Sequence, residues 1–155
     1  MNTLYVLVGV PGAGKSTWVK NQFWTKYCAY VSSDYYVEKF AQKLNRTYSE
    51  VFEDVIPRAI RLMNRAVIRA KDSNQDIIWD QTSVTIKTRA RKLRMLNDYR
   101  TIAVVFDTPP LEELYYRLKQ REGKHIPQRV IHQMLEHWQD PTLEEGFSEI
   151  WHINF

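Results

Sequence analysis

Short apolar runs alternate along the chain with longer segments of mixed polarity. The first run, LYVLV, is apolar throughout, as are strands that a parallel sheet buries on both faces. Four later runs are also bounded by glycine, proline or polar residues, which is typical of strands. The predicted strands are residues 4–8, 28–31, 76–80, 101–106 and 149–155.

Helical periodicity fills the intervals between these strands, with apolar side chains every three or four residues and polar or proline residues where helices would begin. The predicted helices are residues 16–27, 35–44, 49–70, 85–99, 111–121 and 127–138. Pro57 should kink the long helix or move its start. This alternation predicts one α/β domain over residues 1–155, with three layers, a mainly parallel sheet of about five strands, flanking helices and right-handed crossovers.

Composition narrows the class of protein. With 155 residues, 44% hydrophobic and 26% charged, the chain fits a folded globular domain. No run approaches the roughly 18 apolar residues of a membrane span, and the N-terminus lacks a basic leader with a cleavage site. The single cysteine, Cys28, leaves no internal disulfide or cysteine-based metal cluster. We therefore expect a cytoplasmic protein with no membrane partner; the sequence does not indicate an oligomeric state.

The strongest motif is GVPGAGKST at residues 9–17, a complete P-loop between a predicted strand and a predicted helix. Its glycines allow successive N–H groups to turn toward one point, where a triphosphate would lie. Lys15 would reach the β- and γ-phosphates, Ser16 would ligate magnesium, and Thr17 would start the helix. The motif predicts ATP and Mg²⁺ as cofactors and a P-loop NTPase fold. The predicted nucleotide-binding residues are Gly9, Gly12, Ala13, Gly14, Lys15, Ser16 and Thr17.

Two aspartates follow predicted strands, at the sheet edge where the P-loop also lies. Asp34 would either cap the helix that begins near Tyr35 or accept a proton from an alcohol. Asp80 would hold magnesium through water, position the acceptor, or form a turn. Gln81 and Thr82 add neutral hydrogen-bonding groups for a substrate.

A helical lid is predicted over residues 111–138, approximately. Arg117 and Arg121 are four residues apart and so share a helix face, and Gly123 follows them and would permit motion. The arginines would either belong to such a lid or lie on a solvated face, where Glu113 would pair with Arg117.

The segments GVPGAGKSTW, VSSDYY, IIWDQT, VVFDTPP and EELYYRLKQREGKHIP, in this order and spacing, resemble the phage polynucleotide kinases, P-loop enzymes that phosphorylate 5′-hydroxyl ends. The resemblance covers nearly the whole chain. It implies transfer of the γ-phosphate of ATP to a 5′-hydroxyl end of DNA or RNA, with single-stranded ends as partners. It further implies that Asp34 is the general base, that Asp80 lies at the acceptor site, and that Arg121 is catalytic while Arg117 binds nucleotide.

The chain departs from that family at two points. An arginine typically stands three residues after the base and reaches toward the acceptor phosphate, whereas this chain has Val37. Bifunctional members continue into a phosphatase domain with a D-x-D motif, whereas VVFDTPP has no second aspartate at that spacing, so no 3′-phosphatase activity is expected.

Basic and aromatic side chains leave alternatives open. One stripe of basic residues is Arg58, Arg61, Arg65 and Arg69, and a second is Lys87, Arg91 and Arg94, beside Arg89 and Lys92. Each stripe would follow a phosphodiester backbone or form a solvated helix face. The second stripe shares its helix with a predicted buried side of Ile86, Ala90, Leu93 and Leu96. The aromatic residues Tyr35, Tyr36 and Trp79 would stack on a base or pack in the core. The four histidines form no zinc pattern.

Rival functions fit the same motifs. The first is a kinase for a small molecule, a nucleotide or nucleoside, or a modified base in DNA, built on the same scaffold. The second, which Asp34 and Asp80 disfavour, is a nucleotide-dependent interaction module.

Overall fold

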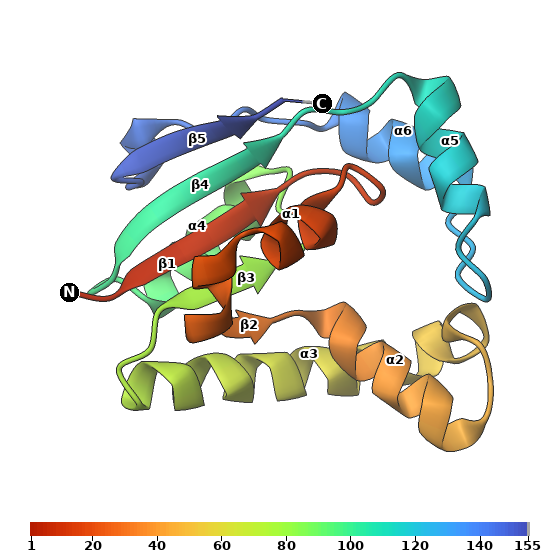
Figure 1. Cartoon of the computed structure of the whole chain (residues 1–155), viewed down its shortest axis with the longest axis horizontal. Coiled ribbons are helices and arrows are strands. Elements are labelled where there is room, and N and C mark those ends of the chain that lie inside the picture. The colour runs from red at the N-terminus through yellow and green to blue at the C-terminus, as the bar shows by residue number, and fades with distance from the viewer. Residues whose placement is uncertain (155) are drawn as a thin grey trace.

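Five parallel strands form a sheet through the middle of the structure, a computed structural model in which residues 1–154 are described (Figure 1). The strands are β1 (Thr3–Val8), β2 (Ala29–Val31), β3 (Ile77–Asp80), β4 (Arg100–Phe106) and β5 (Glu149–Ile153), in the order β2-β3-β1-β4-β5. Each neighbouring pair is parallel, which confirms the predicted sheet. The last predicted strand included Phe155, which lies outside the described residues.

Six α-helices surround the sheet in the described residues: α1 (Lys15–Asn21), α2 (Ser33–Leu44), α3 (Tyr48–Asp72), α4 (Ile86–Met95), α5 (Leu111–Lys119) and α6 (Gln128–Glu136). Short 3-10 helices occupy Phe23–Tyr27 (η1) and Leu143–Glu145 (η2). Within the described residues, no helix has both the length and the apolar character that a membrane crossing requires.

Two helices differ from the sequence prediction. The helix expected over residues 16–27 is divided, because Gln22 is extended and the Thr25 hydroxyl donates to the carbonyl of Val19 at 2.6 Å. The long helix begins at Tyr48, where Thr47 and Glu50 form a reciprocal capping box. Pro57 lies inside this helix and does not set its start.

The sheet is covered on both faces, which gives the predicted three layers. On one face Leu4, Val6 and Trp79 pack with apolar residues of α3 and with the end of α4. On the other face Leu7 and Ile78 pack with α1 and η1. A separate cluster joins α5 and α6 to Val10, and so attaches the predicted lid directly to the P-loop. The predicted α/β class is confirmed.

The buried side of α4 is more charged than the sequence predicted. Leu96 is fully buried as expected, but Ile86 is 41% exposed, and Arg89 and Lys92 are buried. These two basic residues therefore do not belong to an exposed stripe. Buried charge is tolerated only with partners. Arg89 forms two contacts with the carboxylate of Glu145, at 2.8 and 3.1 Å. The ammonium of Lys92 lies 5.2 Å from the centre of the Trp79 ring.

Candidate active site

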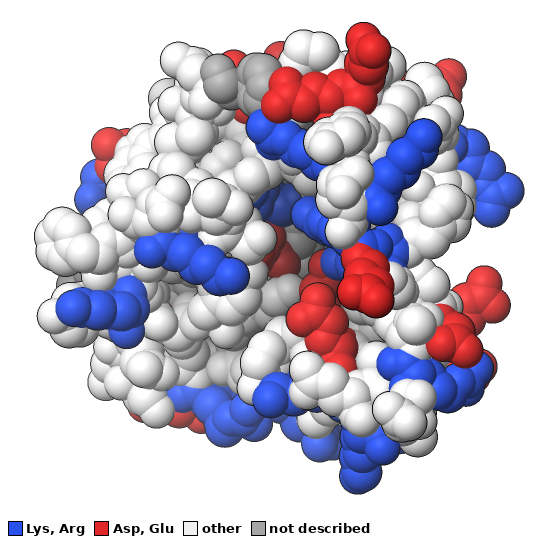
Figure 2. Space-filling view, turned by 45° about the vertical axis from the view of Figure 1, so that its right-hand side comes forward, with Lys and Arg blue, Asp and Glu red and all other residues white. Residues whose placement is uncertain are grey.

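A cavity of about 1750 Å³ opens at the edge of the sheet where β1, β2 and β3 end. Its walls come from the P-loop, α1, η1, the segments after β2 and β3, the start of α3, and the predicted lid. Figure 2 shows the hollow near the middle of one face, with acidic groups inside it and basic groups along its upper and left edges. The volume exceeds the roughly 300–1000 Å³ of common small-molecule sites, so the cavity has room for a nucleotide and a second substrate.

The P-loop has the backbone geometry that its glycines predict. Gly12 and Gly14 have φ of 85° and 98°, values that side-chain-bearing residues avoid. A Cβ on Gly12 would lie 2.8 Å from Leu114 Cδ1, so this glycine also lets α5 approach the loop. The ammonium of Lys15 donates to the Gly9 carbonyl at 2.6 Å. Burial lowers the pKa of Lys15 to about 8, against the opposing effect of nearby carboxylates.

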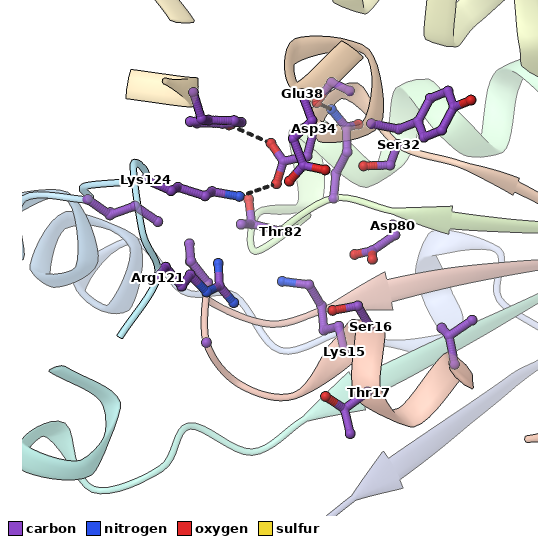
Figure 3. Close-up of a pocket in the computed structure, with 18 of the residues that line it drawn as sticks. Lys15, Ser16, Thr17, Ser32, Asp34, Glu38, Asp80, Thr82, Arg121 and Lys124 are labelled. Atoms are coloured by element: carbon purple, nitrogen blue, oxygen red, sulfur yellow. Dashed lines mark hydrogen bonds and ion pairs between the residues drawn. The ribbon is translucent and has the colours of Figure 1, made fainter. Parts of the chain in front are cut away.

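The predicted magnesium ligand, Ser16, lines the cavity beside Lys15 and Thr17. Figure 3 shows Ser16 near Asp80, with Lys15 between the P-loop and the carboxylates. Among the described residues, no cluster of three or more histidine, cysteine or acidic side chains could hold a metal. Mg²⁺ commonly takes one or two protein ligands and completes its shell with phosphate oxygens and water, so the donor set here fits a nucleotide-bound magnesium ion.

Asp34 lies in the first turn of α2, directly after β2. Its Oδ1 accepts a hydrogen bond from the Tyr48 hydroxyl at 2.6 Å, and its Oδ2 accepts one from the Lys124 ammonium at 2.8 Å. The N-cap of α2 is Ser32, so the carboxylate of Asp34 does not cap this helix. Burial raises the pKa of Asp34, but the charge and hydrogen bond of Lys124, together with the Tyr48 hydroxyl and Lys15, outweigh it and leave the pKa lowered.

Asp80 ends β3, and its pKa is shifted in the opposite direction to that of Asp34. Burial raises its pKa above the usual value, although Lys15 and a hydrogen bond from the Tyr30 hydroxyl act in the other direction. The neighbouring carboxylate of Asp34 adds to the increase. Two carboxylates in one cavity with pKa values moved in opposite directions can perform different tasks.

Gln81 and Thr82 continue from Asp80 into the cavity wall. The Gln81 amide donates to the Ser33 hydroxyl at 3.2 Å and accepts from the Trp79 indole at the same distance. The Thr82 carbonyl accepts from the backbone N–H of Gly9 at 3.0 Å. The segment after β3 is therefore tied both to α2 and to the P-loop.

Both lid arginines line the cavity. Arg117 donates to the carbonyl of Gly12 and to the carboxylate of Glu113, each at 3.1 Å, so the expected pair with Glu113 forms together with a P-loop contact. Arg121 lies beyond the end of α5 and points toward Lys15 (Figure 3). Gly123 follows with φ of 73°.

The sequence prediction missed Tyr30, Tyr48 and Lys124. Tyrosine and lysine are ordinary surface residues, and only folding brings Lys124, 90 residues away, to Asp34. Trp79 is fully buried in the core cluster between the sheet and α3, so it does not line the cavity. Tyr36 packs against the core, whereas the half-exposed Tyr35 lines the cavity.

The basic residues that line the cavity are not those of the two predicted stripes. None of Arg58, Arg61, Arg65, Arg69, Lys87, Arg91 and Arg94 lines it, whereas Lys20, Lys26 and Arg129 do.

Comparison with known proteins relates this geometry to kinases. A family model described as an AAA domain matches residues 4–141. A bifunctional polynucleotide phosphatase/kinase of Schizosaccharomyces pombe is 23% identical over 157 residues, which cover 98% of this chain and 33% of that protein. The chain thus spans about a third of the length of this curated relative.

Solved structures share the fold. A putative kinase from Chloroflexus aurantiacus J-10-fl has a TM-score of 0.66 at 15% identity, covering 99% of this chain and 85% of that one. A chain of the Pnkp1/Rnl/Hen1 RNA repair complex has a TM-score of 0.66 at 24% identity, covering 88% and 43%. Shikimate kinase from Acinetobacter baumannii has a TM-score of 0.55 at 20% identity, covering 100% and 85%.

Proposed function

The chain belongs to the AAA domain family and is a P-loop kinase domain, and from this premise we propose that it transfers the γ-phosphate of ATP to the 5′-hydroxyl end of a DNA or RNA strand. The observation that carries the proposal is the meeting of four elements in one cavity: the P-loop, Asp34, Asp80 and the lid arginines. This set supplies both a phosphate cradle and an acceptor side.

In the proposed reaction, the acceptor oxygen attacks the γ-phosphorus, the bond to the β-phosphate oxygen breaks, and ADP leaves. Asp34 accepts the proton that the hydroxyl loses, and Asp80 positions the acceptor. Lys15 and the loop amides hold the triphosphate, and Arg121 stabilises charge on the transferred group. Bound magnesium, held by Ser16 and phosphate oxygens, would neutralise phosphate charge.

The rim of the cavity favours a polynucleotide as acceptor. Lys20 and Lys26 line it on the side of α1 and η1, and Phe23 beside them is 79% exposed. The side formed by α3 carries Glu53 and Asp54 instead. Single strands bind where cations follow the backbone and exposed aromatic rings stack on bases. A strand would therefore leave the cavity along α1 and η1.

A small-molecule kinase is the second candidate, because of the side chain at position 37. Val37 is fully buried in the cluster between α2 and α3, so this helix presents no cation to an acceptor phosphate from that position. A small alcohol without a phosphate would need no cation at this position.

The test is transfer of labelled γ-phosphate from ATP to 5′-hydroxyl DNA and RNA oligonucleotides, with nucleosides and small alcohols in parallel. Asp34→Asn should lower transfer at least about 100-fold and leave ATP binding intact, since a general base contributes roughly 10²–10⁴-fold. Asp72→Asn, at the exposed end of α3 and not among the residues that line the cavity, is the matched control and should retain transfer. Label only in a small alcohol would establish the second candidate; label only in free phosphate, with a nucleotide-dependent protein complex, would establish an interaction module.

A further inference from the structure

Both carboxylate oxygens of Asp34 already accept a hydrogen bond in this structure. Oδ1 accepts from Tyr48 at 2.6 Å, and Oδ2 accepts from Lys124 at 2.8 Å. A general base must come within roughly 2.6–3.2 Å of the hydroxyl whose proton it accepts. Each oxygen has a second lone pair that a hydroxyl can reach, but the charge of Lys124 lowers the pKa of Asp34 and so makes it a weak base as long as the two stay paired.

Of these two partners, Lys124 is the one whose side chain can move more easily. Tyr48 belongs to the first turn of α3, whereas Lys124 extends a flexible side chain from the loop between α5 and α6. That side chain is only 13% exposed, and its ammonium lies 4.4 Å from the centre of the Tyr48 ring. The ammonium thus stays inside the cavity and can exchange one partner for another by side-chain rotation.

The backbone on both sides of Lys124 is held against the start of α3. The Ser49 N–H donates to the Gly123 carbonyl at 3.1 Å, and the His125 N–H donates to the Ser49 hydroxyl at 2.7 Å. A Cβ on Gly123 would lie 3.1 Å from the Thr47 side chain, which shows how closely the loop approaches α3. These contacts hold the loop over the acceptor side of the cavity on both flanks of Lys124.

We propose that Lys124 forms the binding site for the acceptor's own phosphate: its ammonium moves from Asp34 to the phosphate nearest the acceptor hydroxyl and thereby frees Oδ2 for that hydroxyl. The inference rests on the proposed function. An ammonium that leaves a carboxylate inside a cavity needs another anion, and a phosphate supplies it. A neutral acceptor supplies no such anion and leaves Lys124 paired with Asp34.

The position of Lys124 favours the acceptor's phosphate over the phosphates of ATP. Figure 3 shows Arg121 directed toward Lys15 at the P-loop, whereas Lys124 extends toward Asp34. Lys15, Arg117 and Arg121 already lie on the P-loop side of the cavity. Val37, in contrast, gives the acceptor side no cation from α2. The ligand class is a nucleoside or polynucleotide end whose 5′-hydroxyl is accompanied by a 3′-phosphate or phosphodiester.

The experiment compares two acceptors, a nucleoside 3′-monophosphate and the same nucleoside without phosphate, in wild type, Lys124→Met and Lys124→Arg. Wild type should prefer the phosphorylated acceptor. Lys124→Met should raise KM for that acceptor roughly 10- to 100-fold, as expected for one charged hydrogen bond, and bring the ratio of the two kcat/KM values toward one. Lys124→Arg should retain the preference. Lys119→Met, which removes an exposed lysine of α5, is the matched control.

Each outcome decides between the two proposals. Selective transfer to the phosphorylated acceptor that Lys124→Met leaves unchanged would overturn the role of Lys124 and keep the proposed function. A KM increase for ATP alone would assign Lys124 to the donor and also overturn the inference. Wild type that phosphorylates no nucleoside or oligonucleotide would overturn both. If Lys124→Met does not fold, Lys124→Gln, which keeps a hydrogen-bond donor for Asp34, replaces it with the same expectation.

Discussion

Asp34 and Asp80 show how neighbouring side chains assign different properties to the same functional group. Asp34 has an ammonium and a phenol as direct partners, so its charged form is favoured. Asp80 is more strongly desolvated and has only the Tyr30 hydroxyl as a direct side-chain partner in the described residues, so its pKa is raised. The lowered pKa keeps Asp34 charged but also makes it a weak base while Lys124 is bound to it. In the proposed reaction, its basicity rises when Lys124 moves to the acceptor phosphate.

Tyr48→Phe tests the phenol contact through stability. The pKa of Asp34 is lower in the folded protein than in the unfolded chain. The hydrogen bond from Tyr48 to the charged carboxylate therefore stabilises the fold fully above the unfolded pKa of about 3.9, and this stabilisation is lost as pH falls through the lower folded value. Because the Asp34 side chain is half exposed, the loss at pH 7 should be only about 0.5–1 kcal/mol.

Urea unfolding at pH 7 and at about pH 2–3 measures this difference, which should shrink at the acidic pH. Tyr116→Phe, on the exposed side of α5, is the control. A loss of equal size at both pH values would show that the phenol acts independently of Asp34 ionisation.

At the scale of elements, α4 supports the segment after β3 through a buried ion pair. Arg89 is fully buried, contacts both carboxylate oxygens of Glu145 in η2, and donates to the Ser83 carbonyl at 2.9 Å. Glu145 also accepts from the backbone N–H of Thr142. The pair thus connects η2 to the segment that begins at Asp80.

Arg89→Met should lower the free energy of unfolding by about 3–5 kcal/mol, because it leaves the carboxylate of Glu145 buried without its partner. Arg91→Met, on the exposed side of the same helix, should change it by less than about 0.5 kcal/mol. Chemical denaturation measures both. A similar small change in the two variants would contradict the structural role of the pair.

The same helix shows where sequence reasoning succeeds and where it fails. Strands, helices and the P-loop were predictable because apolar runs, periodicity and glycine spacing are local signals. The buried side of α4 was not, since Arg89 becomes a core residue only when Glu145, 56 positions later, folds against it. Lys124 and Tyr48 escaped prediction for the same reason, and the break at Gln22 depends on a hydrogen bond from Thr25.

At the scale of the whole molecule, charge divides the rim of the cavity into two sides. Basic residues line it along α1, η1 and the predicted lid, whereas acidic residues line it along α3. The net charge of +4 therefore describes the surface less well than its distribution does. A nucleic-acid strand would be attracted on the basic side and repelled on the acidic side, so it would leave the cavity on the basic side.

Lys20→Ala with Lys26→Ala should weaken binding of a fluorescent 5′-hydroxyl oligonucleotide and make it less dependent on salt. Each lost phosphate contact should reduce the slope of log K against log salt by about 0.7, the value for single strands. Fluorescence anisotropy at salt concentrations from about 50 to about 200 mM measures this slope.

Lys87→Ala with Arg91→Ala, on α4 and away from the cavity, removes the same charge and should leave the slope as in wild type. Equal slopes for wild type and both double variants would show that the basic residues of α1 and η1 do not bind the strand.

The contacts that complete the site join distant parts of the chain. Lys124 meets Asp34 across 90 positions, and Arg117 meets Gly12 across 105. Contacts of such long sequence separation form slowly. During synthesis the P-loop and both aspartates leave the ribosome well before their lid partners exist. Because β1 lies between β3 and β4, and α5 packs on the P-loop, the nucleotide cradle itself is completed only after α5 has been synthesised. In the proposed function, catalytic competence therefore arrives late, when the loop after α5 reaches α3.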